Sequence, residues 1–169
     1  MTLVQMLYGD VDVSFEKLEG YFAKVVEHNP GTYAKVEKSG SYFYRSILIP
    51  KFCIGAAKLC QEVIALDGTH LKDVMSTNGV LLLATTRDPN NELIILALAI
   101  VPVEDGSNWT WFLNHVKAAG IMDKNPVILS DRQKGLINAC NTVCPSPSLL
   151  HATHRRQHQK NQGALAYPS

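Results

Sequence analysis

The sequence has no acidic residue after Asp131 and no glutamate after Glu104. The chain also has almost no excess of one charge over the other, because 16 Lys and Arg and 15 Asp and Glu give a net charge of +1. With 46% hydrophobic residues, this balance excludes a strongly charged, disordered tail protein. The acid-free end is nevertheless basic, and its cations are Arg132, Lys134, Arg155, Arg156 and Lys160. Such a segment either meets a polyanion or is a solvated tail.

Long apolar runs and cysteines are scarce as well. The longest apolar run, residues 93–101, has nine residues, whereas a membrane-spanning helix needs about 20. The first residues, MTLVQMLYGD, have neither a basic region nor a small-residue cleavage site, so we expect no secretory signal. Four cysteines are too few for a disulfide scaffold. We therefore expect reduced thiols and no membrane segment.

Apolar spacing predicts an N-terminal flanking region, residues 1–58, ahead of a larger core. Residues 14–28 place apolar side chains at helical intervals, with Ser14 as the predicted N-cap. Residues 41–49, SYFYRSILI, are aromatic and β-branched and lie between glycine and proline, which predicts a strand. Residues 51–61 weakly favour a helix.

The core, residues 59–169, has the pattern of a mixed α/β domain. Its predicted strands are 62–66, 80–86, 93–101, 127–130 and 149–153, and its predicted helices are 108–119, capped by Ser107-Asn108, and 132–142. The turn-forming sequence Asp88-Pro89-Asn90-Asn91 joins the second and third strands as an antiparallel hairpin. Antiparallel strands followed by helix–strand units predict a mixed sheet with helices on both faces.

Two aspartates come directly after predicted strands. Asp67 follows residues 62–66 and Asp131 follows residues 127–130. If these strands are parallel neighbours, the two carboxylates meet and can hold Mg²⁺, as phosphodiester chemistry requires. Structural interpretations stay open, because Asp67-Gly68 is a common turn pair and Asp131 could cap the next helix. For Asp88 and Asp105 we favour a hairpin turn and a helix start.

Four blocks occur in the chain in the order VIALDGTHLK, GVLLLATTRDPNNELIILALAIV, SNWTWFLNHV and VILSDRQKGLINA. In order and spacing they resemble the transposase domain of Mutator-like elements (MULEs). The helix leading into Asn29-Pro30-Gly31-Thr32 and the SYFYRSILI strand resemble the region before that domain. The resemblance therefore runs from about residue 14 to about residue 162. It implies a ribonuclease-H-like, five-stranded mixed sheet.

The resemblance implies metal-dependent cleavage and transfer of DNA strands by an Asp-Asp-Glu triad. Asp67 would be the first catalytic carboxylate and Asp131 the second, both as ligands of Mg²⁺ or Mn²⁺. His70, in the block of Asp67, would lie at the edge of the site, or is packed or capping. The basic residues of the C-terminal end would contact DNA. A nuclear location follows from the same resemblance, and a homo-oligomer is expected for an intact relative.

The chain departs from the family in two places. The family's third acid is a glutamate well downstream of the second aspartate, but none follows Glu104, so that role has no residue. The family's Cys-x-x-His positions, counted back from Asn161, hold His154 and Gln157, with His158 adjacent. We therefore expect a core that is incomplete at its C-terminus and inactive in strand transfer. The alternative is a non-catalytic, transposase-derived module that binds DNA or another partner.

The remaining aromatic and thiol residues are interpreted as packing. The residues that match the family's WxWF-like block are Trp109, Trp111 and Phe112, which we assign to the core. Cys53 and Cys60 have no partner pattern and are interpreted as structural. A zinc site would need Cys140, Cys144, His151 and His154, but the gap between its two pairs is short for a finger. We do not expect zinc.

Overall fold

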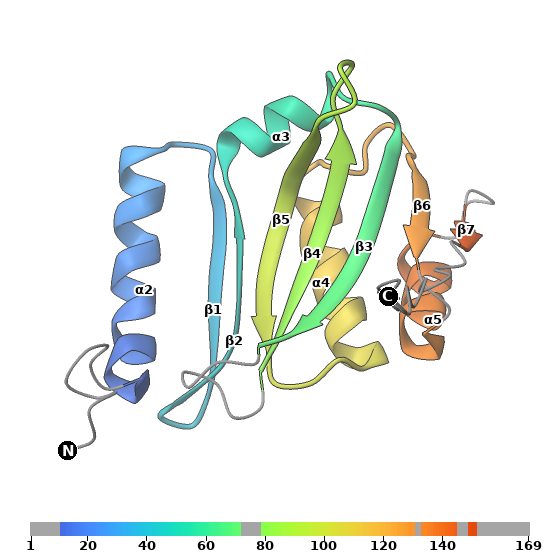
Figure 1. Cartoon of the computed structure of the whole chain (residues 1–169). Coiled ribbons are helices and arrows are strands. Elements are labelled where there is room, and N and C mark those ends of the chain that lie inside the picture. The colour runs from blue at the N-terminus through green and yellow to red at the C-terminus, as the bar shows by residue number, and fades with distance from the viewer. Residues whose placement is uncertain (1–10, 72–78, 131–132, 145–148, 152–169) are drawn as a thin grey trace, which may run out of the picture.

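The computed structural model describes residues 11–71, 79–130, 133–144 and 149–151 and builds them around one mixed sheet (Figure 1). Seven strands lie in the order β1-β2-β5-β4-β3-β6-β7. The strands are β1 Tyr33–Ser39, β2 Tyr42–Ile49, β3 Val63–His70, β4 Val80–Arg87, β5 Leu93–Val101, β6 Val127–Ser130 and β7 Leu149–His151. The helices are α2 Val11–His28, α3 Lys51–Ala57, α4 Gly106–Ala118 and α5 Lys134–Val143.

The sheet is antiparallel from β1 to β3 and parallel from β3 to β7. β3, β4 and β5 form a meander, and the crossover through α4 brings β6 parallel to β3, as a helix–strand unit requires. The predicted order of three antiparallel strands followed by helix–strand units is therefore confirmed. The predicted number of five strands is wrong, because β1 and β2 extend the same sheet beyond β5.

β1 is the strand that the apolar pattern did not predict. Its sequence, YAKVEKS, contains one β-branched residue and three charged ones, so it does not alternate between apolar and polar positions. Gly40 has φ 62 and allows the tight turn into β2. β1 is a strand because its charged side chains find partners on β2 and on α4, which only the tertiary structure provides.

Two helices begin at other residues than predicted. α2 begins at Val11, so Ser14 lies inside the helix and is not its N-cap. α4 is capped by Asp105, whose Oδ1 accepts the backbone N–H of Asn108 at 2.7 Å, and not by Ser107. The interpretation of Asp105 as a helix start is confirmed. Adjacent polar residues compete for a cap, and the one with extended backbone takes it.

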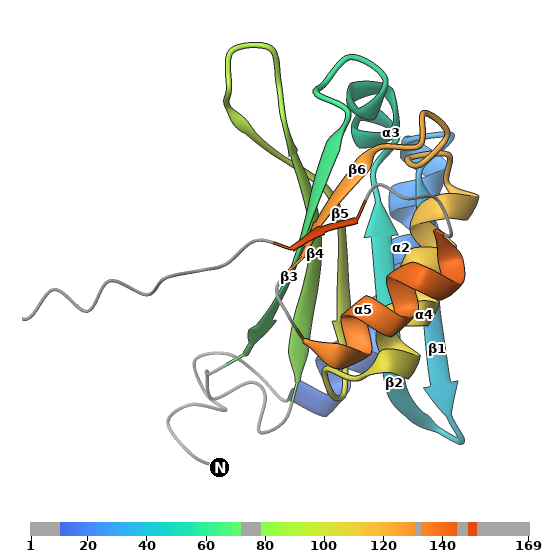
Figure 2. The same cartoon turned by 90° about the vertical axis from the view of Figure 1, so that its right-hand side faces the viewer.

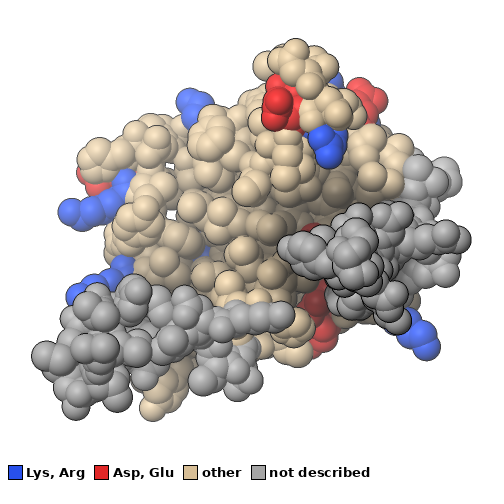
Figure 3. Space-filling model, in the orientation of Figure 1, with Lys and Arg blue, Asp and Glu red and all other residues tan. Residues whose placement is uncertain are grey.

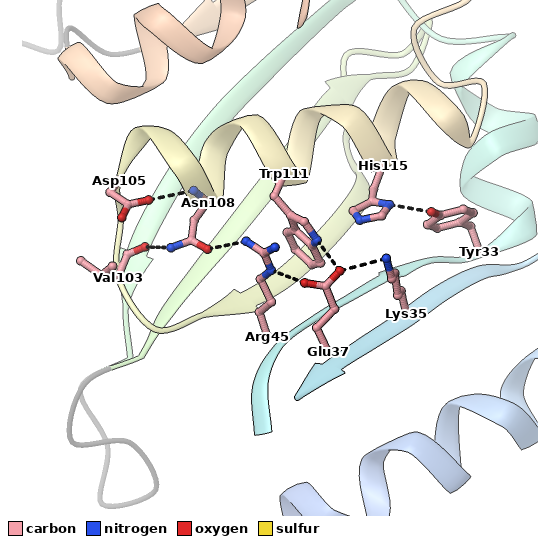
Figure 4. Close-up of polar contacts among 9 residues, drawn as sticks. All are labelled: Tyr33, Lys35, Glu37, Arg45, Val103, Asp105, Asn108, Trp111 and His115. Carbon is pink, nitrogen blue, oxygen red and sulfur yellow. Dashed lines mark hydrogen bonds and ion pairs between the residues drawn. The ribbon is translucent and has the colours of Figure 1, made fainter. Parts of the chain in front are cut away.

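Helices cover both faces of the sheet, as predicted. α4 and α5 pack together on one face, and α2 runs along the other side of β1 and β2 (Figures 2 and 4). Lys38 of β1 pairs with Glu19 of α2 at 2.6 Å, and Phe43 of β2 stacks on Phe15 at 4.4 Å between ring centroids. The surface of the middle strands that faces away from α4 carries few charged side chains (Figure 3).

The hydrophobic core lies between the sheet and the pair α4 and α5. The inner face of α4 supplies its largest members, and Trp109, Phe112, Leu113 and Val116 are fully buried, as predicted. Trp109 and Phe112 meet edge to face with centroids 5.8 Å apart, which adds about 0.5–1.5 kcal/mol to their burial. Within the part of the chain that the structure describes, no helix has the length and hydropathy to cross a membrane.

Candidate functional site

Asp67 lies inside β3, not at its end. β3 continues to His70, and Asp67 and Gly68 pair with Leu83 and Leu82 of β4. The interpretation of Asp67-Gly68 as a turn is therefore wrong, because both residues belong to a ladder of extended backbone. Leu66 is buried toward α4, so alternation directs Asp67 to the opposite face, where it is exposed. The Asp67 carboxylate makes no hydrogen bond or ion pair with another described residue.

β6 is the parallel neighbour of β3, which is the condition that the metal-site interpretation of the two aspartates requires. Ile64 pairs with Ile128 and Ala65 with Leu129, so paired positions differ by 64 residues (128 − 64 = 64). β6 ends at Ser130, and Asp131, the next residue, lies outside the described residues together with Arg132. The separation of the two aspartates in the sequence is also 64 (131 − 67 = 64).

α5 begins at Lys134, three residues after Asp131, and is capped by Gln133. The Gln133 Oε1 accepts the backbone N–H of Leu136 at 2.6 Å, so the interpretation of Asp131 as the cap of this helix is wrong. The other end of the amide, Nε2, donates to the backbone carbonyl of Glu104 at 3.2 Å. Gln133 thus joins the start of α5 to the segment between β5 and α4.

Glu104 lies against the backbone of β3 beside Asp67. A Cβ placed on Gly68 would be 2.6 Å from the carboxyl carbon of Glu104, so only glycine leaves room for this carboxylate. The indole N–H of Trp109 donates to Glu104 Oε1 at 3.3 Å. The sequence analysis noted Glu104 only as the last glutamate. The available signal was the glycine that follows Asp67, since a glycine inside a strand marks a close approach.

The other predicted site residues are partly within the described chain. His70 ends β3, is exposed and pairs with Val80; three positions from Asp67, it faces the other side of the sheet by alternation. Lys134 is exposed on the first turn of α5. The predicted cations Arg132, Arg155, Arg156 and Lys160 lie outside the described residues, as do His154, Gln157, His158 and Asn161.

Oxygen donors, not thiols, are the metal ligands that this region offers. Among the described residues, no group of three His, Cys, Asp or Glu side chains could hold a metal ion. Asp67 nevertheless fits Mg²⁺ or Mn²⁺, because its carboxylate is exposed and has no described partner. Cys140 is 2% exposed, and burial together with neighbouring Cys144 raises its pKa to about 12. A protonated, buried thiol is a poor zinc ligand.

A second polar cluster joins α4 to the hairpin of β1 and β2 (Figure 4). Glu37 of β1 accepts from Arg45 Nε at 2.7 Å and from the Trp111 indole at 3.0 Å, and it pairs with Lys35 at 2.9 Å. Burial raises the pKa of Glu37, but the hydrogen bonds from Lys35, Arg45 and Trp111 outweigh it and lower the pKa to about 2. The assignment of Trp111 to the core is therefore only partly right. Its indole N–H serves this cluster.

The cluster continues along α4 in both directions (Figure 4). Arg45 donates to Asn108 Oδ1 at 3.1 Å and lies over the Trp111 ring, 4.4 Å from its centroid. At the other end, the Tyr33 hydroxyl and His115 Nδ1 share a hydrogen bond of 2.5 Å. Burial and the charge of Lys35 lower the pKa of His115, so its ring stays neutral near pH 7. Each group has a structural partner, so this cluster attaches the hairpin and is not a candidate active site.

A groove formed by described residues lies at α3, away from Asp67. It encloses about 680 Å³ between the end of α2 and the start of α3, and Val25, Pro30, Pro50 and Phe52 are among its lining residues. No carboxylate or histidine lines it. The groove therefore lacks the acid–base and metal-binding groups of an active site.

A family model for the MULE transposase domain matches residues 63–155. The match covers β3 through β7 and more than half of the 169-residue chain, including the meander, both aspartates and α4. The chain belongs to the MULE transposase domain family. It is thus a transposase-related protein, as its sequence blocks predicted. No curated protein sequence matches it.

Proposed function

We propose that residues 59–169 form a ribonuclease-H-like core in which Asp67 and Asp131 hold Mg²⁺ or Mn²⁺ for chemistry on DNA strands. The parallel register of β3 and β6 carries this proposal. If the same register continued two residues past Ala65 and Leu129, the offset of 64 would bring Asp131 level with Asp67 and onto the same face. Neighbouring strands are about 4.8 Å apart, a spacing at which two carboxylates can share a metal.

The chemistry divides between the metal and the protein. Bound Mg²⁺ or Mn²⁺ would activate the attacking oxygen and stabilise the leaving oxygen of a phosphodiester. Asp67 and Asp131 would hold the cation through their carboxylate oxygens. Residue 67 on a paired strand is a rigid support, because its backbone is fixed by β4. DNA is the substrate class that the family implies, and a nuclear location belongs to the same proposal.

Strand transfer is not expected from this 169-residue chain alone. No glutamate follows Asp131, so the family's third acid has no counterpart in it. Loss of one carboxylate weakens a metal site, and errors of about 1 Å in geometry cost about a hundredfold in rate. The second candidate function, a non-catalytic DNA-binding module, is favoured by the basic, acid-free residues after Asp131.

Thermal unfolding with and without Mn²⁺ tests the metal site. We expect Mn²⁺ to raise the melting temperature of the wild type, because a free Mn²⁺ concentration of 100 times Kd adds about 2.7 kcal/mol to the free energy of unfolding. The melting temperatures of Asp67→Asn and Asp131→Asn should not change with Mn²⁺. The control is Asp123→Asn, which removes an exposed carboxylate in the segment after α4. This variant should show the same Mn²⁺ shift as the wild type. A Mn²⁺ shift that survives Asp67→Asn would contradict the proposal.

DNA binding separates the two candidate functions. The metal-site function predicts binding that Mn²⁺ strengthens and Asp67→Asn weakens. The binding-module function predicts an affinity that is indifferent to Asp67→Asn and falls steeply with salt. Metal-dependent cleavage of DNA that Asp131→Asn abolishes would show instead that this chain is an active nuclease.

A further inference from the structure

We propose that Glu104 and Gln133 form a bridge that sets the spacing between the two aspartates. Glu104 contacts β3 next to Asp67, and Gln133 begins α5 two residues after Asp131. Both are positioning residues, since neither is assigned to the metal itself. The inference rests on the proposed function, because it explains how that metal site is held together.

The β3 half of the bridge is a contact between a carboxylate and a backbone. The Glu104 carboxyl group lies where a side chain of Gly68 would be, with both oxygens within 2.9 Å of that Cβ position. The Trp109 indole holds the carboxylate there by donating to Oε1. Trp109 is fully buried in the core, so the carboxylate is tied to a rigid anchor.

The α5 half of the bridge is an amide that makes two contacts at once. Gln133 Oε1 caps α5 through Leu136, and Nε2 donates to the Glu104 carbonyl. Directly beside it the helix starts touch, because a Cβ on Gly135 would be 2.7 Å from the backbone nitrogen of Gly106. The segment that contains Glu104 therefore contacts both α5 and β3.

The bridge matters because β6 pairs with β3 only as far as Ala65 and Leu129. Among the described residues, no ladder pair joins β3 and β6 past these positions, and both aspartates follow them in the sequence. Glu104 and Gln133 span this stretch. Residues that orient metal ligands in this way typically change metal affinity by about 10- to 100-fold when they are substituted.

Two variants break the bridge without removing a ligand. Gln133→Ser keeps a strong N-cap for α5, because serine caps helices well, but it is too short to reach the Glu104 carbonyl. Gly68→Ala displaces the Glu104 carboxylate, which is the end of a flexible side chain, so the strand itself is preserved. Gln61→Ser is the matched control. It removes a glutamine amide that donates to the Asp88 carbonyl at 3.5 Å, before the start of β3.

The measurement is Mn²⁺ affinity, followed by the loss of the free-ion resonance in electron paramagnetic spectra. We expect Gln133→Ser and Gly68→Ala to bind Mn²⁺ about tenfold more weakly than the wild type and Gln61→Ser to match it. The indole N–H resonances report the local change. That of Trp109 should shift in both variants, whereas that of Trp111, which donates to Glu37, should not.

The outcomes distinguish the two proposals. Wild-type affinity in both bridge variants would overturn the bridge and leave the metal site standing. Absence of Asp67-dependent Mn²⁺ binding in the wild type would overturn the proposed function and the bridge with it. If Gln133→Ser fails to melt cooperatively, Gly68→Ala decides, because its displaced group is a side chain and not backbone.

Discussion

The two sides of α4 are held to their neighbours by different kinds of contact. Toward β1 and β2, charged and polar groups face one another, with the carboxylate of Glu37 at the centre. Toward β3 and α5, close approach dominates: a Cβ on Gly68 would lie 2.6 Å from the Glu104 carboxyl carbon, and a Cβ on Gly135 would lie 2.7 Å from the Gly106 backbone nitrogen. A charged contact weakens gradually with pH and salt, whereas a steric contact fails when a single methyl group is added. The side of α4 that faces β3 and α5, where the candidate site lies, therefore tolerates added side-chain volume least.

The largest effect is expected at the contact between the helix starts. Gly135→Ala places a Cβ 2.7 Å from the Gly106 nitrogen and 3.2 Å from the Asp105 carbonyl carbon. Because these atoms are backbone and cannot move alone, we expect a loss of about 2–3 kcal/mol in the free energy of unfolding. Urea denaturation measures it. Gly20→Ala in α2, with nothing within 4 Å, is the control and should stabilise by about 0.5–1 kcal/mol.

A smaller, pH-dependent effect is expected at Glu37. Its pKa is about 2 in the folded protein and 4.5 ordinarily, so its carboxylate stabilises the fold above pH 4.5 and loses this effect as the pH falls toward 2. The side chain is 26% exposed, which moderates the gain to about 1–2 kcal/mol. We expect Glu37→Gln to lose this amount at pH 7 and to converge with the wild type near pH 2.

The control for Glu37 is another glutamate in an ion pair with lysine. Glu19 pairs with Lys38 at 2.6 Å but is 64% exposed, and exposed pairs contribute little. Glu19→Gln should therefore unfold at the wild-type urea concentration at pH 7 and at pH 3. Equal losses in the two variants would show that the cluster on α4 behaves like an ordinary surface pair, and the contrast between the two sides of α4 would weaken.

The smallest effect is expected at Ser130. Its hydroxyl is buried and has no hydrogen-bond partner among the described residues, so Ser130→Ala should change the stability by less than about 0.5 kcal/mol or raise it slightly. Thr86 is the counterpart, because its hydroxyl donates to the Val63 carbonyl at 2.7 Å. Thr86→Val should cost about 1 kcal/mol. A large loss in Ser130→Ala would reveal a partner for its hydroxyl.

Apolar periodicity was sufficient to predict the middle strands of the sheet but not its edge strand β1. The strands 80–86 and 93–101 were predicted within one residue of β4 and β5, because both are apolar and joined by a turn of clear chemistry. Asp88 confirms that turn by accepting the Glu92 N–H at 2.8 Å. β1 was missed because its stability comes from contacts between residues as distant as Glu37 and Trp111.

The sequence suggests the two candidate aspartates but not the residues that surround them. Their meeting depends on the condition that β3 and β6 are parallel neighbours, and the structure meets that condition. The length of β3 was underestimated, because Asp67-Gly68 has the chemistry of a turn and only its pairing with β4 keeps it extended. Gly68 indicated a close approach to β3, but nothing in the sequence identified Glu104 or Gln133 as the residues that approach it. Their roles depend on distances between segments that the sequence separates.

The hairpin of β1 and β2 is synthesised long before the strand that completes its sheet. Ser46 of β2 pairs with Ile100 of β5, 54 positions later (100 − 46 = 54), whereas β4 and β5 are joined by a short turn and can pair as soon as both have left the ribosome. During that interval β2 has an open edge, and β1 also has one in the finished sheet, where it is the edge strand. The charges of β1, Lys35, Glu37 and Lys38, oppose pairing with other nascent chains. The same charged residues that keep β1 from showing an apolar strand pattern thus disfavour association through its exposed edge.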